Sequence, residues 1–427
     1  MLALRCVQLS VCPPTRGPQL ITSDSFESQN HRSALAEPRF LRYFISSCFS
    51  TVGIWLIRFL LGWIGWETTH SALWVGVVAG ALMFPSIILS PIFGIICDRI
   101  NPRNGLLITV STHVLLACIA GVTYLLEWFS LPWLIFLTIM FGIVASAHTP
   151  IRLSLVPRLV WREALPSAIG YSAITFNTSR ILGPAIGTGL ITTASVAVAF
   201  FAALILFVIA LGFLFTVKDV NAMEGKKKSR LSQELKAGLV YVKQHRGIRL
   251  VLSFTLINGL LGRTVIELLP ALSGQLLNGD SNTLAILTGG AGAGSIIGSL
   301  VVSRQRGNEP RLLNMVMGSL LLGVLLLFTV RWMDGLAALG ALIAGLSMVT
   351  TIVGTCSQAL AQLLVVDEYR GRVMSLWAVL ALGTPALGTL GMGALADFFG
   401  FPMVLAIFAL LAVPAILFLF RRKDSLL

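Results

Sequence analysis

Four charged residues lie inside long apolar stretches of the sequence: Arg58, Arg180, Arg263 and Glu267. A charge at the centre of a lipid bilayer costs at least about 2.5–3.5 kcal/mol, so it usually faces a partner group or a water-filled path. In such places a guanidinium group can bind an anion, and a carboxylate can take up and release a proton. If these stretches cross a membrane, the four residues are candidates for substrate binding and ion coupling.

Glu267 is the first candidate for a proton-coupling group, because it is the carboxylate placed most clearly inside an apolar stretch. Arg263 precedes it by four positions, and residues at that spacing meet on one face of a helix. The alternative is a permanent ion pair between the two. Arg58 would compete for the same carboxylate across a central cavity, or extend its side chain to the lipid headgroups.

Arg180 lies near the middle of its stretch, after a run of polar residues that begins at Asn177. It could bind an anionic part of a substrate, pair with a carboxylate of the opposite half, or act as a fixed polar anchor for helix packing. The sequence leaves these interpretations open. Asn177 and Arg180 therefore join the other three as predicted substrate or coupling residues.

The composition excludes an ordinary water-soluble domain. Of the 427 residues, 56% are hydrophobic and only 11% are charged, and the mean hydropathy is +0.88. Soluble domains average about 25% charged residues. Apolar windows of about 20 residues, the length of a membrane-spanning helix, recur along the chain. They predict helices at 40–66, 72–97, 105–127, 131–151, 166–192, 194–217, 248–273, 283–303, 311–330, 335–365, 371–396 and 399–420.

These windows predict an all-α polytopic membrane protein with twelve transmembrane helices in two pseudo-symmetric six-helix bundles. The predicted parts are a flexible cytoplasmic tail at 1–39, a first bundle at 40–217, a linker with a short amphipathic helix at 218–247, a second bundle at 248–420 and a cytoplasmic tail at 421–427. Substrate sites of such two-bundle transporters lie at the interface of the bundles, near the middle of the membrane.

Basic residues are distributed very unequally across the predicted membrane. Of the 31 Lys and Arg residues, nearly all lie in the tails, the linker, the connections on the same predicted face, or the helix ends next to them. The exceptions are Arg58, Arg180, Arg263 and Arg331. Cytoplasmic loops carry an excess of Lys and Arg, so both termini are predicted to be cytoplasmic. This distribution also explains the net charge of +13 without a nucleic-acid partner.

A loop motif lies between the second and third predicted helices. The run GIICDRINPRN places four residues at the spacing GxxxDRxxxR: Gly94, Asp98, Arg99 and Arg103. This spacing resembles the loop signature of the major facilitator superfamily, and the resemblance implies a transporter with a cytoplasmic gate here. Gly94 allows a close helix approach, and Asp98 can face a helix N-terminus or a basic partner in one conformation only.

A second motif lies in the fifth predicted helix and resembles the antiporter motif of the same superfamily: Gly170, Ser179, Gly183, Pro184 and Gly187. Ser179 replaces a glycine of that motif. Small residues allow close helix packing, and a proline allows a bend. The eighth predicted helix carries Gly290, Gly294 and Gly298. Because helices five and eight of this superfamily meet across the two halves, the two stripes are expected to form one sliding interface.

Several stretches between 40 and 420 resemble the efflux branch that includes siderophore and macrolide exporters: 53–76, 156–187, 235–252 and 369–379. The resemblance implies a proton-coupled exporter of a small amphipathic, drug-like or siderophore-like molecule, acting as a monomer in a bacterial inner membrane. Ile54 stands where this branch often has an acidic residue. That departure weakens any coupling scheme that depends on a carboxylate in the first helix.

The sequence predicts no cofactor, no metal site and no enzymatic activity. It contains no GxxxxGK[ST], HExxH or GxSxG motif, the signatures of phosphate-binding loops, zinc proteases and hydrolases. His113 and His148 are predicted to be isolated residues, packed or at the rim, rather than metal ligands. The alternatives to an exporter are a lipid or lysophospholipid flippase on the same fold, an intramembrane transferase and a non-transporting receptor. The expected partners are membrane lipid, a small-molecule substrate and protons.

Overall fold

The computed structural model describes residues 34–97, 100–161, 164–218, 239–304, 309–333, 335–366 and 369–421, and these are almost entirely helical. The first half consists of α1 (Pro38–Thr69), α2 (Ala72–Cys97), α3 (Pro102–Leu125), α4 (Leu131–Leu159), α5 (Leu165–Thr193) and α6 (Val196–Phe215). The second half consists of α8 (Arg246–Asn258), a π-helix (Gly259–Arg263), α9 (Thr264–Glu267), α10 (Leu269–Leu277), α11 (Ser281–Ser303), α12 (Glu309–Thr329), α13 (Leu336–Leu364), α14 (Arg370–Phe399) and α15 (Phe401–Arg421).

Eleven helical segments of the described residues are long and apolar enough to cross a membrane, and one of them runs continuously from α8 to α9. The remaining long helix is α5, whose polar run from Asn177 to Arg180 lowers its hydropathy. Its 29 residues are nevertheless long enough to span a bilayer, because an α-helix rises about 1.5 Å per residue. With α5 included, the described helices follow the predicted order of twelve spans.

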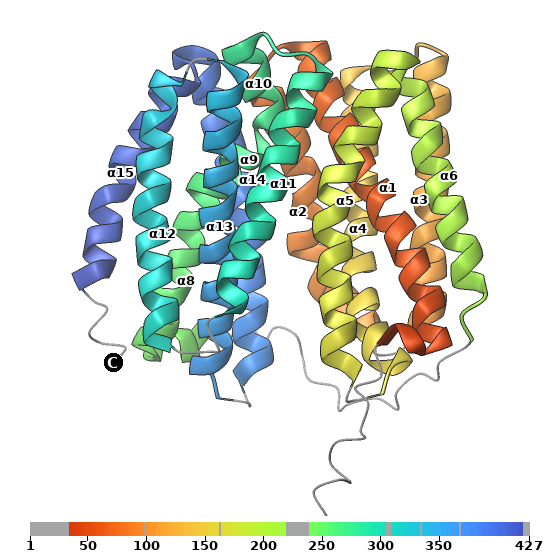
Figure 1. Ribbon diagram of the computed structural model, residues 1–427, viewed down its shortest axis with the longest axis horizontal. Helices are drawn as coiled ribbons and strands as arrows, with labels where there is room; N and C mark the ends of the chain where they lie inside the picture. Colours follow the sequence, from red (N-terminus) through yellow and green to blue (C-terminus); the bar gives the residue numbers. More distant parts are fainter. Residues whose placement is uncertain are drawn as a thin grey trace, which may run out of the picture.

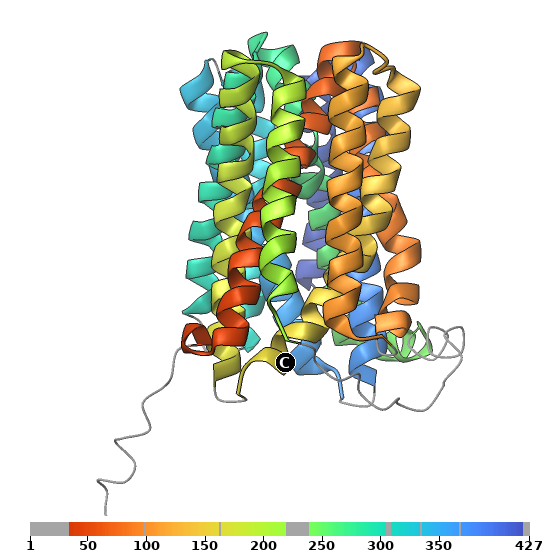
Figure 2. The same cartoon turned by 90° about the vertical axis from the view of Figure 1, so that its right-hand side faces the viewer.

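The helices stand in two groups side by side, with α1–α6 on the right of Figure 1 and α8–α15 on the left. α1 begins and α15 ends at the same end of the molecule, drawn at the bottom of Figures 1 and 2. We call this end the lower end, and the opposite end, where α1 passes into α2, the upper end. An even number of crossings accounts for both described chain ends lying on one side.

The faces turned away from the other half carry large, exposed apolar side chains. Ile108 and Leu115 of α3 are 66% and 58% exposed, and Leu411 of α15 is 67% exposed. Water disfavours such a surface, whereas the hydrocarbon core of a bilayer does not. These faces therefore suit contact with lipid.

The two halves meet along two pairs of helices, α2 with α14 and α5 with α11. Glycines let α2 and α14 approach very closely: a Cβ atom at Gly76 would overlap the backbone of Thr389, and one at Gly393 would lie 2.5 Å from the carbonyl oxygen of Ala72. These contacts lie in the upper parts of both helices. The halves are therefore packed tightly against each other toward the upper end.

The glycine stripes of the fifth and eighth predicted helices do not face each other. Gly183 and Gly187 of α5 pack against α1 of the same half, and the α11 glycines, Gly294 among them, pack against the backbone of α13. The expectation of one shared sliding interface is wrong, although α5 and α11 do meet, through Ile181 and Gly292. Glycine spacing shows that a helix face is small, but it does not identify the helix that packs there.

Parts of the predicted tail and linker belong to the described residues. Ala34–Ala36 form a 3-10 helix, and Ala34 is fully buried, so the last residues of the predicted tail are packed. Residues 239–244 of the linker are helical, and Tyr241 stacks on Tyr369 with ring centroids 4.4 Å apart. Residues 1–33, 219–238 and 422–427 lie outside the described residues.

Candidate functional site

The segment from α8 to α10 carries two of the predicted charged residues and is irregular where they lie. Gly259–Arg263 form a π-helix, and the hydroxyl of Thr264 donates to the carbonyl oxygen of Gly259 at 2.8 Å. Below it, the amide of Asn258 donates to the carbonyl oxygen of Thr350 at 3.2 Å. A π-helix adds a residue to the turn and changes which residues share a face, and it occurs often at functional sites.

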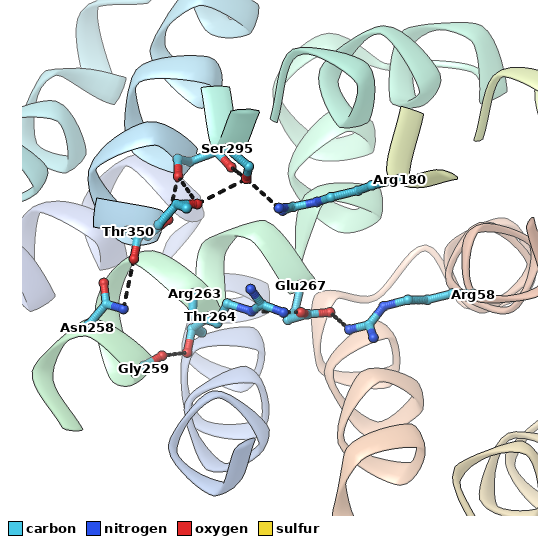
Figure 3. Close-up of polar contacts among 11 residues, drawn as sticks. Arg58, Arg180, Asn258, Gly259, Arg263, Thr264, Glu267, Ser295 and Thr350 are labelled. Atoms are coloured by element: carbon cyan, nitrogen blue, oxygen red, sulfur yellow. Dashed lines mark hydrogen bonds and ion pairs between the residues drawn. The ribbon is translucent and has the colours of Figure 1, made fainter. Parts of the chain in front are cut away.

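Glu267 forms ion pairs with two arginines, one from each half of the protein (Figure 3). Nη2 of Arg58, on α1, donates to Oε2 of Glu267. Nε of Arg263 lies 3.4 Å from Oε1. The Glu267 side chain is only 9% exposed, and a carboxylate removed from water requires such partners. The predicted pairing with Arg263 is present, and Arg58 reaches across the interface.

Arg180 donates to one hydroxyl group of the opposite half instead of pairing with a carboxylate (Figure 3). Its Nη1 donates to Oγ of Ser295 on α11 at 2.5 Å. Ser295 also lies 2.9 Å from Oγ of Ser347 and 3.1 Å from Oγ1 of Thr351, both on α13. Arg180 is only 6% exposed, and no Asp or Glu of the described residues lies within ion-pair distance of it.

Trp55 of α1 lies between two of these arginines. The guanidinium carbon of Arg58 is 5.4 Å from the centroid of its ring, and that of Arg180 is 5.7 Å from it. Both distances suit cation–π contact. Trp55 therefore brings the two positive groups close together, although like charges repel.

Two cavities adjoin this cluster and share three wall residues, Trp55, Arg58 and Leu82. The upper one, of about 80 Å³, lies between α1, α2, α5 and the α9–α10 segment and contains Arg180 and Glu267. The second, of about 300 Å³, extends toward the lower end along α1, α2 and α4. Ligand pockets measure about 300–1,000 Å³, so the larger cavity can hold a small molecule.

His113 and His148 are close neighbours in the wall of the larger cavity, and the prediction that they are isolated is wrong. Their ring centroids are 5.8 Å apart, and Nδ1 of His148 lies 3.2 Å from Oγ1 of Thr109. Arg152 of α4 lines the same cavity. His113 lies on α3 and His148 on α4. Because the two residues are far apart in the sequence, their spacing could not reveal this contact.

The upper end is closed by Asp397, near the end of α14. Its Oδ1 accepts from the backbone N–H of Ala72 at 2.6 Å. Its Oδ2 accepts from the N–H of Leu73 at 3.0 Å and from Oγ of Ser71 at 2.5 Å. A carboxylate at a helix N-terminus satisfies unpaired N–H groups and complements the helix dipole. Asp397 thus caps α2 from the other half of the protein.

A protein-family model described as "transmembrane secretion effector" matches residues 31–425. This chain belongs to that family, within the major facilitator superfamily. It is therefore a secondary transporter that crosses the membrane many times, and not an enzyme. The alternatives of a transferase and a receptor are thereby set aside.

Curated relatives of this transporter come from bacteria. The chain is 25% identical to the staphyloferrin A transporter of Staphylococcus aureus over 90% of its own length and 97% of the relative's. It is 21% identical to macrolide efflux protein A of Streptococcus pyogenes, over 75% of its length and 80% of the relative's. Both likenesses cover most of each chain.

Solved structures share the fold at low identity. A bacterial homologue of the human lysosomal transporter Spinster, inward-facing and unoccupied, superposes with a TM-score of 0.72 and 11% identity, covering 91% of this chain and 98% of that one. A nucleoside transporter gives a TM-score of 0.72 with 13% identity over 90% of this chain and 100% of the other. The major facilitator fold is thus shown by superposition as well as by sequence.

Asn177 and Arg103, two further predicted site residues of this transporter, lie apart from the cluster. Asn177 is half-buried on α5 and lines neither cavity. Asp98 and Arg99 of the predicted gate fall outside the described residues. Nη2 of Arg103 donates to the carbonyl oxygen of Phe215 at 2.9 Å, which joins the lower ends of α3 and α6.

Of the fifth-helix motif, Pro184 lines the upper cavity beside Arg180, and Ser179 is buried. A Cβ atom at Gly170, near the lower end, would have no neighbouring atom within 4 Å. The motif is therefore divided between the cavity wall, the contact with α1 and open space.

Sequence reasoning missed Trp55, Arg152, Ser295 and Asp397. Ser295 and Trp55 are ordinary residues of apolar stretches, and only the packed structure places them on the arginines. Arg152 lies one residue beyond the fourth predicted helix, on the predicted cytoplasmic face, where a basic residue is ordinary. Asp397 lies directly after the eleventh predicted helix, where the sequence gives no sign of its contacts with α2.

Proposed function

We propose that this transporter is a proton-coupled exporter of a small amphipathic, drug-like or siderophore-like molecule, acting by alternating access in a bacterial inner membrane. The printed names of the relatives, a staphyloferrin A transporter and a macrolide efflux protein, support this class of cargo. The protein functions as a monomer, and its lower end, where the described residues begin and end, faces the cytoplasm.

One observation carries the proposal: a buried carboxylate joins the two halves beside an internal cavity. Glu267 belongs to the second half and accepts from Arg58 of the first. A proton on Glu267 would remove its charge and weaken that contact. The halves could then move apart, so that protonation and rearrangement are linked. Among the described residues, the charged groups that face Glu267 are all arginines, namely Arg58, Arg263 and Arg180.

The arrangement of contacts supports an alternating-access cycle. The seam between α2 and α14 and the Asp397 cap hold the upper end closed, while the larger cavity extends toward the lower end. In the proposed cycle, residues 40–217 and 248–420 move as two units. The upper seam opens, and the loop containing Gly94, Asp98, Arg99 and Arg103 closes the lower end.

Transport by purified protein in liposomes tests the proposal. Vesicles with an acidic lumen and an alkaline medium would be offered labelled erythromycin, ethidium and a carboxylate siderophore. We expect at least one compound to accumulate, and the accumulation to disappear when an ionophore collapses the pH gradient. Liposomes without protein are the control. No accumulation of any of the three under the gradient would count against a proton-coupled exporter.

A further inference from the structure

We propose that the cavity binds a small organic anion with an apolar body, held through its acidic groups by Arg180 and Arg152. This inference rests on the proposed function and names the charge class of its substrate. It also commits to a soluble anion, although an anionic lipid headgroup offers similar chemistry.

The charge of the cavity is the first argument. Four arginines of the described residues line the two cavities, and Glu267 is the one carboxylate beside them: Arg58, Arg152, Arg180 and Arg263. Three positive charges therefore have no negative counterpart in the cavity wall. Unbalanced charge in a region of low dielectric is costly. A mobile anion would remove that cost, whereas a cationic cargo would increase it.

Arg180 is the best placed of the four to hold such an anion. Its partners are the neutral hydroxyl of Ser295 and the ring of Trp55, neither of which neutralises its charge. A guanidinium group binds a carboxylate through two parallel hydrogen bonds. Arg180 lines the upper cavity, so a ligand carboxylate can reach it without breaking an existing ion pair.

Arg152 provides a second positive group in the lower part of the larger cavity. No Asp or Glu of the described residues lies within 4.0 Å of its guanidinium nitrogens. It approaches the cavity beside His148, and Arg58 lies in the wall shared by both cavities. A ligand that carries two acidic groups could therefore contact arginines in both cavities at once.

The rest of the wall specifies the body of the ligand. Leu82, Met83, Phe141 and Phe176 line the larger cavity together with Trp55. Apolar and aromatic walls with a few placed polar groups are typical of sites for small organic molecules. An inorganic anion would leave these side chains without a partner. The ligand class is therefore an amphipathic organic anion.

Equilibrium binding separates this class from the alternatives. The protein in nanodiscs of phosphatidylcholine would be titrated with 2,6-naphthalenedicarboxylate, with its uncharged dimethyl ester, and with lysophosphatidylglycerol, by calorimetry. We expect the dicarboxylate to bind at least about tenfold more tightly than the ester, a difference of about 1.4 kcal/mol. We also expect it to compete with the lysolipid.

Variants identify the site. Arg180→Gln and Arg152→Gln should each weaken dicarboxylate binding about tenfold, with Arg180→Lys between Arg180→Gln and the unmodified protein. Arg331→Gln removes an exposed arginine beyond α12 and should change nothing. The ester comparison needs no variant, so it decides the question even if Arg180→Gln fails to fold.

Several outcomes would overturn the inference: equal binding of ester and dicarboxylate, equal binding by the Arg180 and Arg331 variants, or lysolipid binding that the dicarboxylate cannot displace. The last would assign the site to a lipid headgroup. Binding is measured without a pH gradient. Anion binding without gradient-driven transport would therefore count against the proton-coupled exporter alone, and gradient-driven transport of cations only would count against the anion site alone.

Discussion

In the proposed mechanism, a single proton on Glu267 would change the contact between the halves. Its two oxygens face Arg58 and Arg263, and Arg180 adds positive charge nearby. Glutamine has nearly the same shape as glutamate and cannot take up a proton in this range. Substitution at this residue therefore separates proton coupling from packing.

We predict that Glu267→Gln lowers pH-gradient-driven uptake into proteoliposomes by at least about tenfold, the effect of about 1.4 kcal/mol on a rate. Substrate counterflow without a gradient should persist, because the cavity itself is retained. Rates measured at several external pH values check the expectation. A variant whose transport keeps its pH dependence would remove Glu267 from the coupling role.

At the scale of single residues, the sequence revealed the charged side chains inside the apolar stretches but not the groups that they contact. Arg58, Arg180, Arg263 and Glu267 could be predicted because charge inside an apolar stretch needs a reason. The choice between a pair and a headgroup contact for Arg58 required the structure, since its partner lies 209 positions away. Neutral partners such as Ser295 carry no signal in a single sequence.

Among the helices, α2 depends on the other half for its N-terminal cap. Asp397→Ala removes three acceptor contacts at Ser71, Ala72 and Leu73. We expect the upper ends of the halves to separate more often, seen as longer distances between spin labels at positions 127 and 331 in a background without native cysteines.

Asp280→Ala is the matched control for this change. Asp280 caps its own helix, α11, by accepting from the N–H of Thr283 at 2.9 Å. Its loss should cost about 0.5–2 kcal/mol of stability but leave the label distances unchanged. Equal distance changes in both variants would mean that Asp397 acts only on helix stability.

The seam between α2 and α14 gives a second test. Gly393→Ala would push a Cβ atom against the carbonyl of Ala72, whereas Gly391→Ala, two positions away, meets no atom within 4 Å. We expect only the first to lengthen the label distances and to slow transport several-fold, as overpacking typically costs about 1–3 kcal/mol. Equal label distances and equal transport rates in the two variants would mean that the seam tolerates separation of α2 from α14.

Helix positions were predictable because apolar length sets a span, but two features of these elements were not. The π-helix at Gly259–Arg263 depends on packing of its glycines against Thr384 and Thr350. The partners of the glycine stripes depend on how whole helices are arranged. Neither is encoded in local hydropathy.

In the whole molecule, the proposed cycle requires the halves to separate at the upper end. Thr188 of α5 donates to the carbonyl oxygen of Ser281 across that end at 2.9 Å. We predict that transport is abolished in the double variant Thr188→Cys and Ser281→Cys when a short bis-maleimide crosslinks the two introduced cysteines. Each single substitution, treated in the same way, should retain it. Transport by the crosslinked protein at the rate of the uncrosslinked one would contradict alternating access.

The number and order of spans followed from the sequence, whereas the closed upper end did not. The sequence of a transporter must be compatible with a closed and with an open upper end. Its pattern of apolar spans therefore favours neither conformation. The contacts that distinguish them, such as Asp397 with α2, join residues more than 300 positions apart in the chain. Only a folded structure shows which of them are present.

The excess of arginines in the cavity, which favours an anionic cargo, also determines how transport would respond to the membrane potential. Expelling an anion while admitting a proton moves positive charge inward in both steps, so the exchange is electrogenic. An interior-negative potential would then drive it, by about 2.3 kcal/mol for each elementary charge per 100 mV. Such a pump would continue to work in cells whose internal and external pH are equal, powered by voltage alone. A potassium diffusion potential set with valinomycin, at equal pH on both sides, should therefore be sufficient to start transport.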